Sequence, residues 1–245
     1  MKSREVGHSA VNSLLILAIA LITATAILTG IWAIETIDLS GGDIPATDDV
    51  SVEQGAIYLD RSGQATAVGE IENGHRHAIT NLTITVTYYE DGEVADTQEL
   101  PSIVSTIPAR SIAPYEVKLQ GLYEPDEIDV GITYDEAEAY THVLDITDVE
   151  ETYRSQDQVT LIGEVETSDA DQVRKPTVFA TMYDENGTVI GVRSDQLSRS
   201  AMETDQRDQF AIRYSTIGHL PSLAREYETF SVIAIDDAAP EPEEE

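Results

Sequence analysis

The chain repeats itself once, at an offset of 94 residues. Residues 64–73 read QATAVGEIEN and residues 158–167 read QVTLIGEVET, which share Gln, Thr, Gly and both Glu residues. Further elements keep the register: Ile84 aligns with Val178, Tyr89 with Tyr183 and, after one inserted residue, Asp91-Gly92 with Asn186-Gly187. A period this long is too long for a solenoid and indicates tandem globular domains.

Within each copy, short β-type runs alternate with turn signals, and sustained helical periodicity is absent. From Leu82 to Tyr89, apolar residues alternate with Thr and Tyr, the period of two expected of a strand with one buried face. Glu90-Asp91-Gly92 then predicts a hairpin turn, and residues 93–100 the returning strand. About seven strands per copy predict an all-β fold of two tandem Ig-like antiparallel β-sandwiches, residues 50–137 and 138–236.

Both copies carry a β-strand with GEIEN or GEVET, followed by an alternating strand that ends in a Tyr-acid pair and a Gly turn. This pattern resembles the FxLYD domain, although segments 86–90 and 180–184 lack the Phe and Leu of that name. The resemblance covers both modules. It implies small β-sandwiches on exported prokaryotic proteins, often behind a single membrane anchor, and it implies no catalytic residues.

Residues 14–34 form an apolar run of 21 residues without a charge, Asn, Gln or Pro. A helix of that length spans about 30 Å, the thickness of the bilayer hydrocarbon, so we predict a transmembrane helix. Lys2 and Arg4 precede it and acidic residues follow, which predicts a cytoplasmic segment 1–13 and an extracellular remainder. Small residues at 24–26 leave open a cleaved signal peptide. Residues 35–49 read as a linker.

The composition is strongly acidic, with 46 Asp and Glu against 14 Lys and Arg, only three of them Lys. Such a surface indicates an extreme halophile, because molar salt screens the self-repulsion that would otherwise destabilise a compact fold. The negative charge argues against nucleic-acid binding. The absence of Cys excludes disulfides, thiolate metal sites and cysteine nucleophiles. Residues 237–245 predict a disordered acidic tail.

Three groups of residues are candidate chemical sites, and each has a simpler interpretation. His75 and His77 could bind a metal, but no third ligand is evident, and a solvated loop is favoured. Residues 184–187 resemble a calcium loop, yet an Asn-Gly turn explains them better. The pairs Glu70/Glu72 and Glu164/Glu166 suggest a glycosidase dyad, but we expect exposed carboxylates at strand ends. We therefore predict no catalytic residue, metal or cofactor.

Two sequons, beginning at Asn81 and Asn186, are candidate N-glycosylation sites if this part of the chain is exported. Together these features predict a non-catalytic, membrane-anchored stalk or binding module at the cell surface of a halophile. We expect a protein partner there and no small-molecule substrate. An accessory subunit of a motility, pilus or other cell-envelope machine is the alternative.

Overall fold

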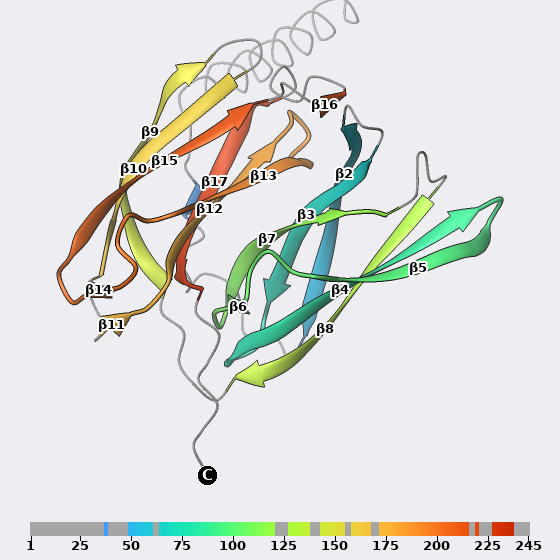
Figure 1. Ribbon diagram of the computed structural model, residues 1–245, viewed down its shortest axis with the longest axis horizontal. Helices are drawn as coiled ribbons and strands as arrows, with labels where there is room; N and C mark the ends of the chain where they lie inside the picture. The colour runs from blue at the N-terminus through green and yellow to red at the C-terminus, as the bar shows by residue number, and fades with distance from the viewer. Residues whose placement is uncertain are drawn as a thin grey trace, which may run out of the picture. The chain divides into compact units, whose positions relative to one another are not determined.

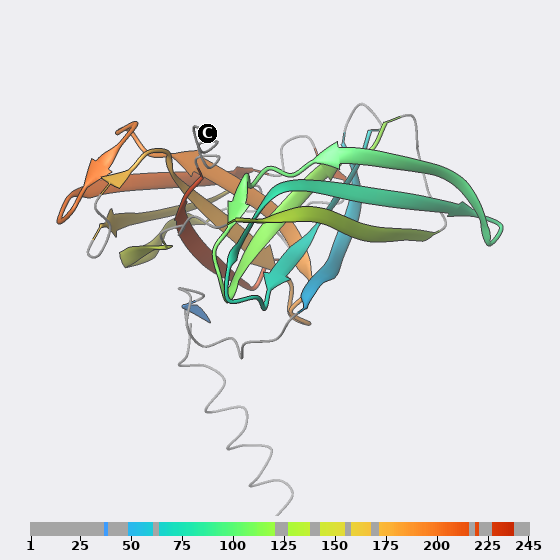
Figure 2. The same cartoon turned by 90° about the horizontal axis from the view of Figure 1, so that it is seen from below.

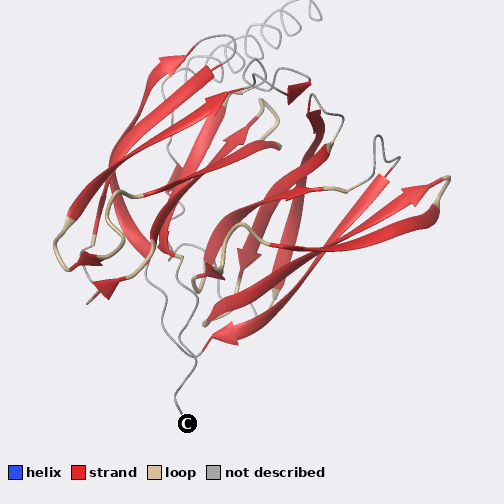
Figure 3. Ribbon diagram, in the orientation of Figure 1, coloured by secondary structure: helices blue, strands red, loops and turns tan. Residues whose placement is uncertain are grey.

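The described part of the chain is all-β and consists of several antiparallel sheets (Figures 1 and 3), which confirms the predicted fold class at this level. The computed structural model describes residues 37–38, 49–60, 64–120, 127–137, 143–154, 158–167, 172–215, 219–220 and 227–237. These residues all belong to one compact unit, Ile37–Glu245. The predicted transmembrane helix lies outside them, and within them no helix could cross a membrane.

The first half of this unit contains β2 to β8 and the second half β9 to β17. The strands are β1 (Ile37–Asp38), β2 (Val50–Asp60), β3 (Ala65–Asn73), β4 (Ala78–Glu90), β5 (Glu93–Pro101), β6 (Thr106–Ile107), β7 (Ser111–Lys118), β8 (Glu127–Ala137), β9 (Val143–Arg154), β10 (Gln158–Glu166), β11 (Gln172–Val173), β12 (Pro176–Tyr183), β13 (Val189–Gln196), β14 (Met202–Glu203), β15 (Arg207–Ser215), β16 (His219–Leu220) and β17 (Thr229–Asp236).

The principal strands pair in the same order in both halves. In the first half, β3 lies between β2 and β7, and β4 lies between β5 and β8. In the second half, β10 lies between β9 and β15, and β12 lies between β13 and β17. A short pairing of β9 with β17 joins the two second-half sheets. The chain therefore uses one strand arrangement twice.

The predicted alternation is seen in β4, where every second residue from Leu82 to Tyr88 is buried and the intervening residues are partly exposed. The hairpin turn to β5 lies at Asp91 and Gly92, both with positive φ. Gly92 fits there because a residue without Cβ adopts the left-handed conformation without strain. Figures 1 and 2 show the hairpin of β4 and β5, with the start of β8 beside it, reaching away from β2, β3 and β7.

Each repeated GEIE or GEVE segment contains a glycine that an aromatic ring covers. A Cβ on Gly69 would lie 2.6 Å from the hydroxyl oxygen of Tyr115, and a Cβ on Gly163 would lie 2.6 Å from Cζ of Phe210. Tyr115 belongs to β7 and Phe210 to the corresponding strand β15. Glycine in both copies thus makes room for a ring from the neighbouring strand.

The two halves share their hydrophobic cores. Phe179, Ile233 and Ile235 of the second half pack with the core of the first, while Tyr58 and Val68 of the first half pack with the core of the second. Every residue of β12 is buried, unlike the half-exposed β4 that it matches in sequence. The second face of β12 is buried because the first half covers it.

Two predicted boundaries differ from the structure. Residues 37–38 of the predicted linker form β1, which pairs in parallel with β17. Asp237, predicted to begin a disordered tail, is buried and pairs with Lys175 at 3.0 Å. Residues 238–245 of that tail lie outside the described residues.

Candidate functional site

The most deeply buried carboxylate among the predicted pairs is Glu70, which is only 8% exposed. The hydroxyl of Tyr183 donates to Glu70 Oε1 at 2.6 Å and lies 2.9 Å from Ser231 Oγ. Glu70 belongs to β3 of the first half, whereas Tyr183 and Ser231 belong to β12 and β17 of the second. The prediction that this carboxylate is exposed at a strand end is therefore wrong, because the second half covers it.

Burial raises the pKa of the Glu70 carboxyl above its usual value. The Tyr183 hydrogen bond opposes this increase by stabilising the charged form, and the carboxylate of Glu53, which faces Glu70 in the β2–β3 register, adds to it. Burial also raises the pKa of the Tyr183 hydroxyl, so it remains protonated and serves as the donor. This arrangement is a buried polar contact inside the interface between the two halves.

Glu164 and Glu166, the matching pair in the second half, have a different environment. Arg207 of β15 contacts Glu164 at 3.1 Å and Glu166 at 2.9 Å, and its side chain is more than half exposed. Exposed ion pairs of this kind contribute little to stability, about 0–1 kcal/mol. The same sequence position therefore holds an interface contact in one half and a solvated ion pair in the other.

Two further polar contacts cross between the halves. Arg193 of β13 pairs with Glu116 of β7 at 3.0 Å, and its guanidinium carbon lies 5.0 Å from the centre of the Tyr214 ring. The backbone N–H of Ser105 donates to the carboxylate of Asp237, at the end of β17. These contacts fix particular residues of the two halves against one another.

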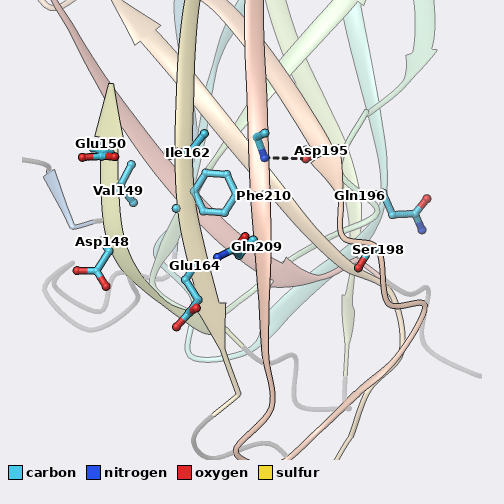
Figure 4. A pocket seen from close by; sticks show the side chains of 12 residues that line it. Asp148, Val149, Glu150, Ile162, Glu164, Asp195, Gln196, Ser198, Gln209 and Phe210 are labelled. Atoms are coloured by element: carbon cyan, nitrogen blue, oxygen red, sulfur yellow. Dashed lines mark hydrogen bonds between the residues drawn. The ribbon is translucent and has the colours of Figure 1, made fainter. Parts of the chain in front are cut away.

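An open depression of about 860 Å³ lies on the second half (Figure 4). Its walls come from β9, β10, β13, β15 and the residues that follow β13, including Val149, Ile162 and Phe210. Four carboxylates also line it: Asp148, Glu150, Glu164 and Asp195. Asp195 accepts a hydrogen bond from the backbone N–H of Ala211 at 3.1 Å, the dashed line of Figure 4. The depression is thus an acidic surface with apolar patches.

His75 and His77 lie in the loop between β3 and β4, as predicted. His75 Nε2 lies 3.1 Å from the hydroxyl of Tyr134, and His77 is exposed. Among the described residues, no group of three or more His, Cys, Asp and Glu is placed to hold a metal ion. The imidazole of His75 is therefore engaged with the side chain of Tyr134.

The Asp184 segment forms a turn. One carboxylate oxygen of Asp184 accepts the backbone N–H groups of Asn186 and Thr188, both at 2.9 Å. These backbone hydrogen bonds, with that of Thr188 the largest, lower the pKa of Asp184. Gly187 adopts φ +80°, as the predicted Asn-Gly turn requires. The carboxylate that suggested calcium binding is engaged in holding its own turn.

Both sequon asparagines are exposed but differ in setting. Asn186 lies at the tip of the β12–β13 turn, where residues 185–188 are all exposed. Asn81 lies inside β4, at an irregularity in the pairing with β8, and has φ +52°. Its side-chain amide donates to Asp135 at 2.9 Å. The acceptor nitrogen of Asn81 is therefore hydrogen-bonded in the folded chain.

Comparison with protein-family models and with curated proteins gives no match to this chain.

The interface residues Tyr183, Ser231 and Asp237 were not identified from the sequence. A signal for the interface does exist in the repeat. On the partly exposed side of β4 and β8, the first half has Thr85, Gly131 and Thr133. The strand registers place Phe179, Ile233 and Ile235 at the corresponding positions of the second half. Apolar residues at these positions in only one copy indicate that only that copy buries its second sheet face.

Proposed function

We propose that this chain is a membrane-anchored, extracytoplasmic protein of a halophile, and that its two Ig-like modules of FxLYD type form a non-catalytic stalk or binding unit at the cell surface. The single observation that carries the proposal is the use of one strand order twice, in halves that share their cores. A duplicated sandwich with an extensive internal interface suits a spacer that presents surfaces at a defined distance from an anchor.

The polar side chains that meet between the two halves also favour a structural role. Glu70, the carboxylate with the strongest burial among the predicted pairs, contacts Tyr183 within the interface, where a substrate has no access. The open depression offers carboxylates and a serine, but its lining includes no His, Lys or Tyr. The serine of this depression therefore has no histidine among the lining residues beside it, so the Ser–His pair that activates a serine nucleophile is not assembled there.

The anchor and its orientation rest on the sequence. The uncharged run at 14–34 has the length of a bilayer span, and the basic residues Lys2 and Arg4 precede it. Residues 35–245 contain 45 of the 46 acidic and 12 of the 14 basic residues, a net charge of −33. That surface suits a compartment of high salt, where charge repulsion is screened.

Protease treatment of intact cells tests this proposal. We expect an added protease to digest residues 50–245 while a cytoplasmic marker stays intact, and the remaining fragment to stay with the membrane after alkaline washing. A chain that resists digestion on intact cells, but is digested once the membrane is permeabilised, would place the modules inside and overturn the proposed location.

A further inference from the structure

Two neighbouring loops at one end of the first half carry positive charge, in a chain whose net charge is −32. The loop between β3 and β4, residues 74–77, reads GHRH, and residues 102–110, around β6, contain one Arg and no Asp or Glu. The side-chain amide of Asn73 joins them, because it donates to the carbonyl oxygen of His77 at 3.0 Å and to that of Pro108 at 2.8 Å. We call these two segments the basic loops.

The second half carries the opposite charge at the matching positions. Residues 168–171, which correspond to the GHRH loop at the offset of 94, read SDAD. In the other basic loop, Arg110 lies five residues before Tyr115, the ring that covers the glycine of its repeat. Asp205 lies five residues before Phe210, the equivalent ring. The shared fold therefore requires neither charge, and the cations are a property of the first half alone.

Arg110 also occupies a backbone conformation that arginine seldom adopts. Its φ is +54°, and the other non-glycine residues with positive φ in the described part of the chain are all Asn or Asp. Asp205, at the matching turn, is one of them, with φ +61°. Short polar side chains tolerate this conformation because they hydrogen-bond locally. The turn itself favours the residue of the second half, so the arginine of the first half points to a contact made by its charge.

Within the described residues, no carboxylate neutralises the two arginines of the basic loops. Neither Arg76 nor Arg110 lies at ion-pair distance from an acidic side chain there. The last two described acids, Asp236 and Asp237, accept backbone N–H groups instead. The guanidinium groups of the basic loops are thus available to an acidic segment from elsewhere.

The acidic end of the chain begins beside these loops. Asp237 is buried and accepts the backbone N–H of Ser105, a residue of the second basic loop. The residues that follow, 238–245, contain four Glu and no cation. Eight residues extend to about 26 Å, whereas the five residues from Ser105 to Arg110 span at most about 18 Å. The C-terminal segment is therefore long enough to reach the basic loops of its own chain.

We propose that residues 241–245 bind the basic loops of the same chain, with their glutamates beside Arg76 and Arg110. Since both partners belong to one chain, their effective concentration is in the mM range, and individually weak ion pairs suffice. A carboxylate in contact with a guanidinium lies about 3 Å away, no farther than the Debye length of about 3 Å in 1 M salt. The contact consequently persists in the saline surroundings proposed above. It goes beyond the proposed function, because it does not depend on the side of the membrane.

A photo-crosslinker on the C-terminal segment tests this contact. Because the chain has no Cys, Pro242→Cys gives the full-length protein a single thiol for benzophenone maleimide, in non-ionic detergent and about 1 M salt. After illumination, peptide mass spectrometry should find this residue joined to the basic loops within the monomer. We expect Arg76→Asp together with Arg110→Asp to lower the crosslinked yield about threefold or more, because both cations become acids.

The matched control combines Arg199→Asp with Arg213→Glu, the same change of charge at exposed positions of the second half. It should crosslink as the unaltered arginines do. A further variant changes only the C-terminal segment, with Gln in place of the glutamates at 241, 243 and 244, and so leaves the strands as they are. It should lower the yield about as much as the loop variant does.

Three results would overturn the proposal: crosslinks absent or spread evenly over the surface, equal losses in the loop and control variants, or an unchanged yield after the glutamates are replaced. Crosslinked dimers in place of crosslinked monomers would assign the basic loops to the C-terminal segment of a second copy, and would overturn the contact within one chain.

Discussion

Tyr183 and Glu70 join the two halves of the chain through a hydrogen bond of 2.6 Å between residues 113 positions apart. Both side chains are buried, and the bond lies between the face of β3 and that of β12. A carboxylate removed from water needs such a donor, because the loss of its hydration is otherwise uncompensated.

Removing that donor should destabilise the fold. Tyr183→Phe leaves the Glu70 carboxylate buried without the hydroxyl, and we expect a loss of about 1–3 kcal/mol in the free energy of unfolding. Chemical denaturation of three variants, Tyr183→Phe, Glu70→Gln and the double substitution, measures the coupling between the two side chains. Additive effects of the two substitutions would show that the hydrogen bond contributes nothing to stability.

The stability of the folded chain should depend on pH through Glu70. The folded state raises the pKa of this carboxyl above its ordinary value of 4.5, mainly by burial, so the folded state binds the proton more tightly than the unfolded state. The stabilising contribution is complete below that ordinary value and declines as pH rises through the raised one. We therefore expect the unfolding free energy of the unaltered chain, minus that of Glu70→Gln, to fall as the pH rises above 4.5.

Subtracting the Glu70→Gln variant cancels groups that titrate in both proteins. Glu72→Gln makes the same substitution at a partly exposed position on the same strand and is the matched control. Tyr183→Phe should steepen the decline, because it removes the hydrogen bond that lowers the Glu70 pKa. A difference that rises with pH would contradict the assigned direction.

Gly55 should not tolerate a side chain. A Cβ there would lie 2.5 Å from the carbonyl oxygen of Val189 and 2.7 Å from its Cβ, so Gly55→Val must push the two halves apart. We expect about 1–3 kcal/mol of destabilisation, typical of overpacking, together with faster amide hydrogen exchange in β13. Gly131→Ala is the control, since its Cβ would lie 4.0 Å from the carbonyl oxygen of Thr85, an ordinary van der Waals distance. Equal effects of the two substitutions would argue against close packing at Gly55.

Asp237 should contribute to stability although it follows the last strand. Asp237→Ala removes the acceptor of the Ser105 backbone N–H and the partner of Lys175, and we expect a loss of about 1–3 kcal/mol. Lys175→Met separates the two effects, because Lys175 is nearly half exposed and its ion pair should matter less. Thermal unfolding of both variants checks this, and a larger shift for Lys175→Met would reverse the assignment.

Glycosylation of the exported chain should favour Asn186 over Asn81. Asn186 lies at an exposed turn tip, whereas the amide of Asn81 is hydrogen-bonded to Asp135 within a strand. Mass spectrometry of peptides from native membranes, with Asn186→Gln and Asn81→Gln as references, measures occupancy at each site. Full occupancy at Asn81 and none at Asn186 would contradict this order.

Local signals in the sequence determined the strands and the duplication. The alternation from Leu82 to Tyr88 predicts one buried face for β4, and the structure has it. Gly92 and Gly187 mark turns in which both adopt φ +80°. These features are readable because side-chain direction in a strand changes with every residue and tight turns restrict the backbone to few residue types.

Only the tertiary structure decided which faces meet. Glu70 and Glu164 occupy equivalent positions in nearly identical segments, yet one is buried against Tyr183 and the other pairs with Arg207 at the surface. Asp237 is likewise buried and accepts a hydrogen bond from the backbone N–H of Ser105, a residue of the other half. Contacts between residues so far apart in the chain leave no periodic signal, because they arise when two complete sheets pack together.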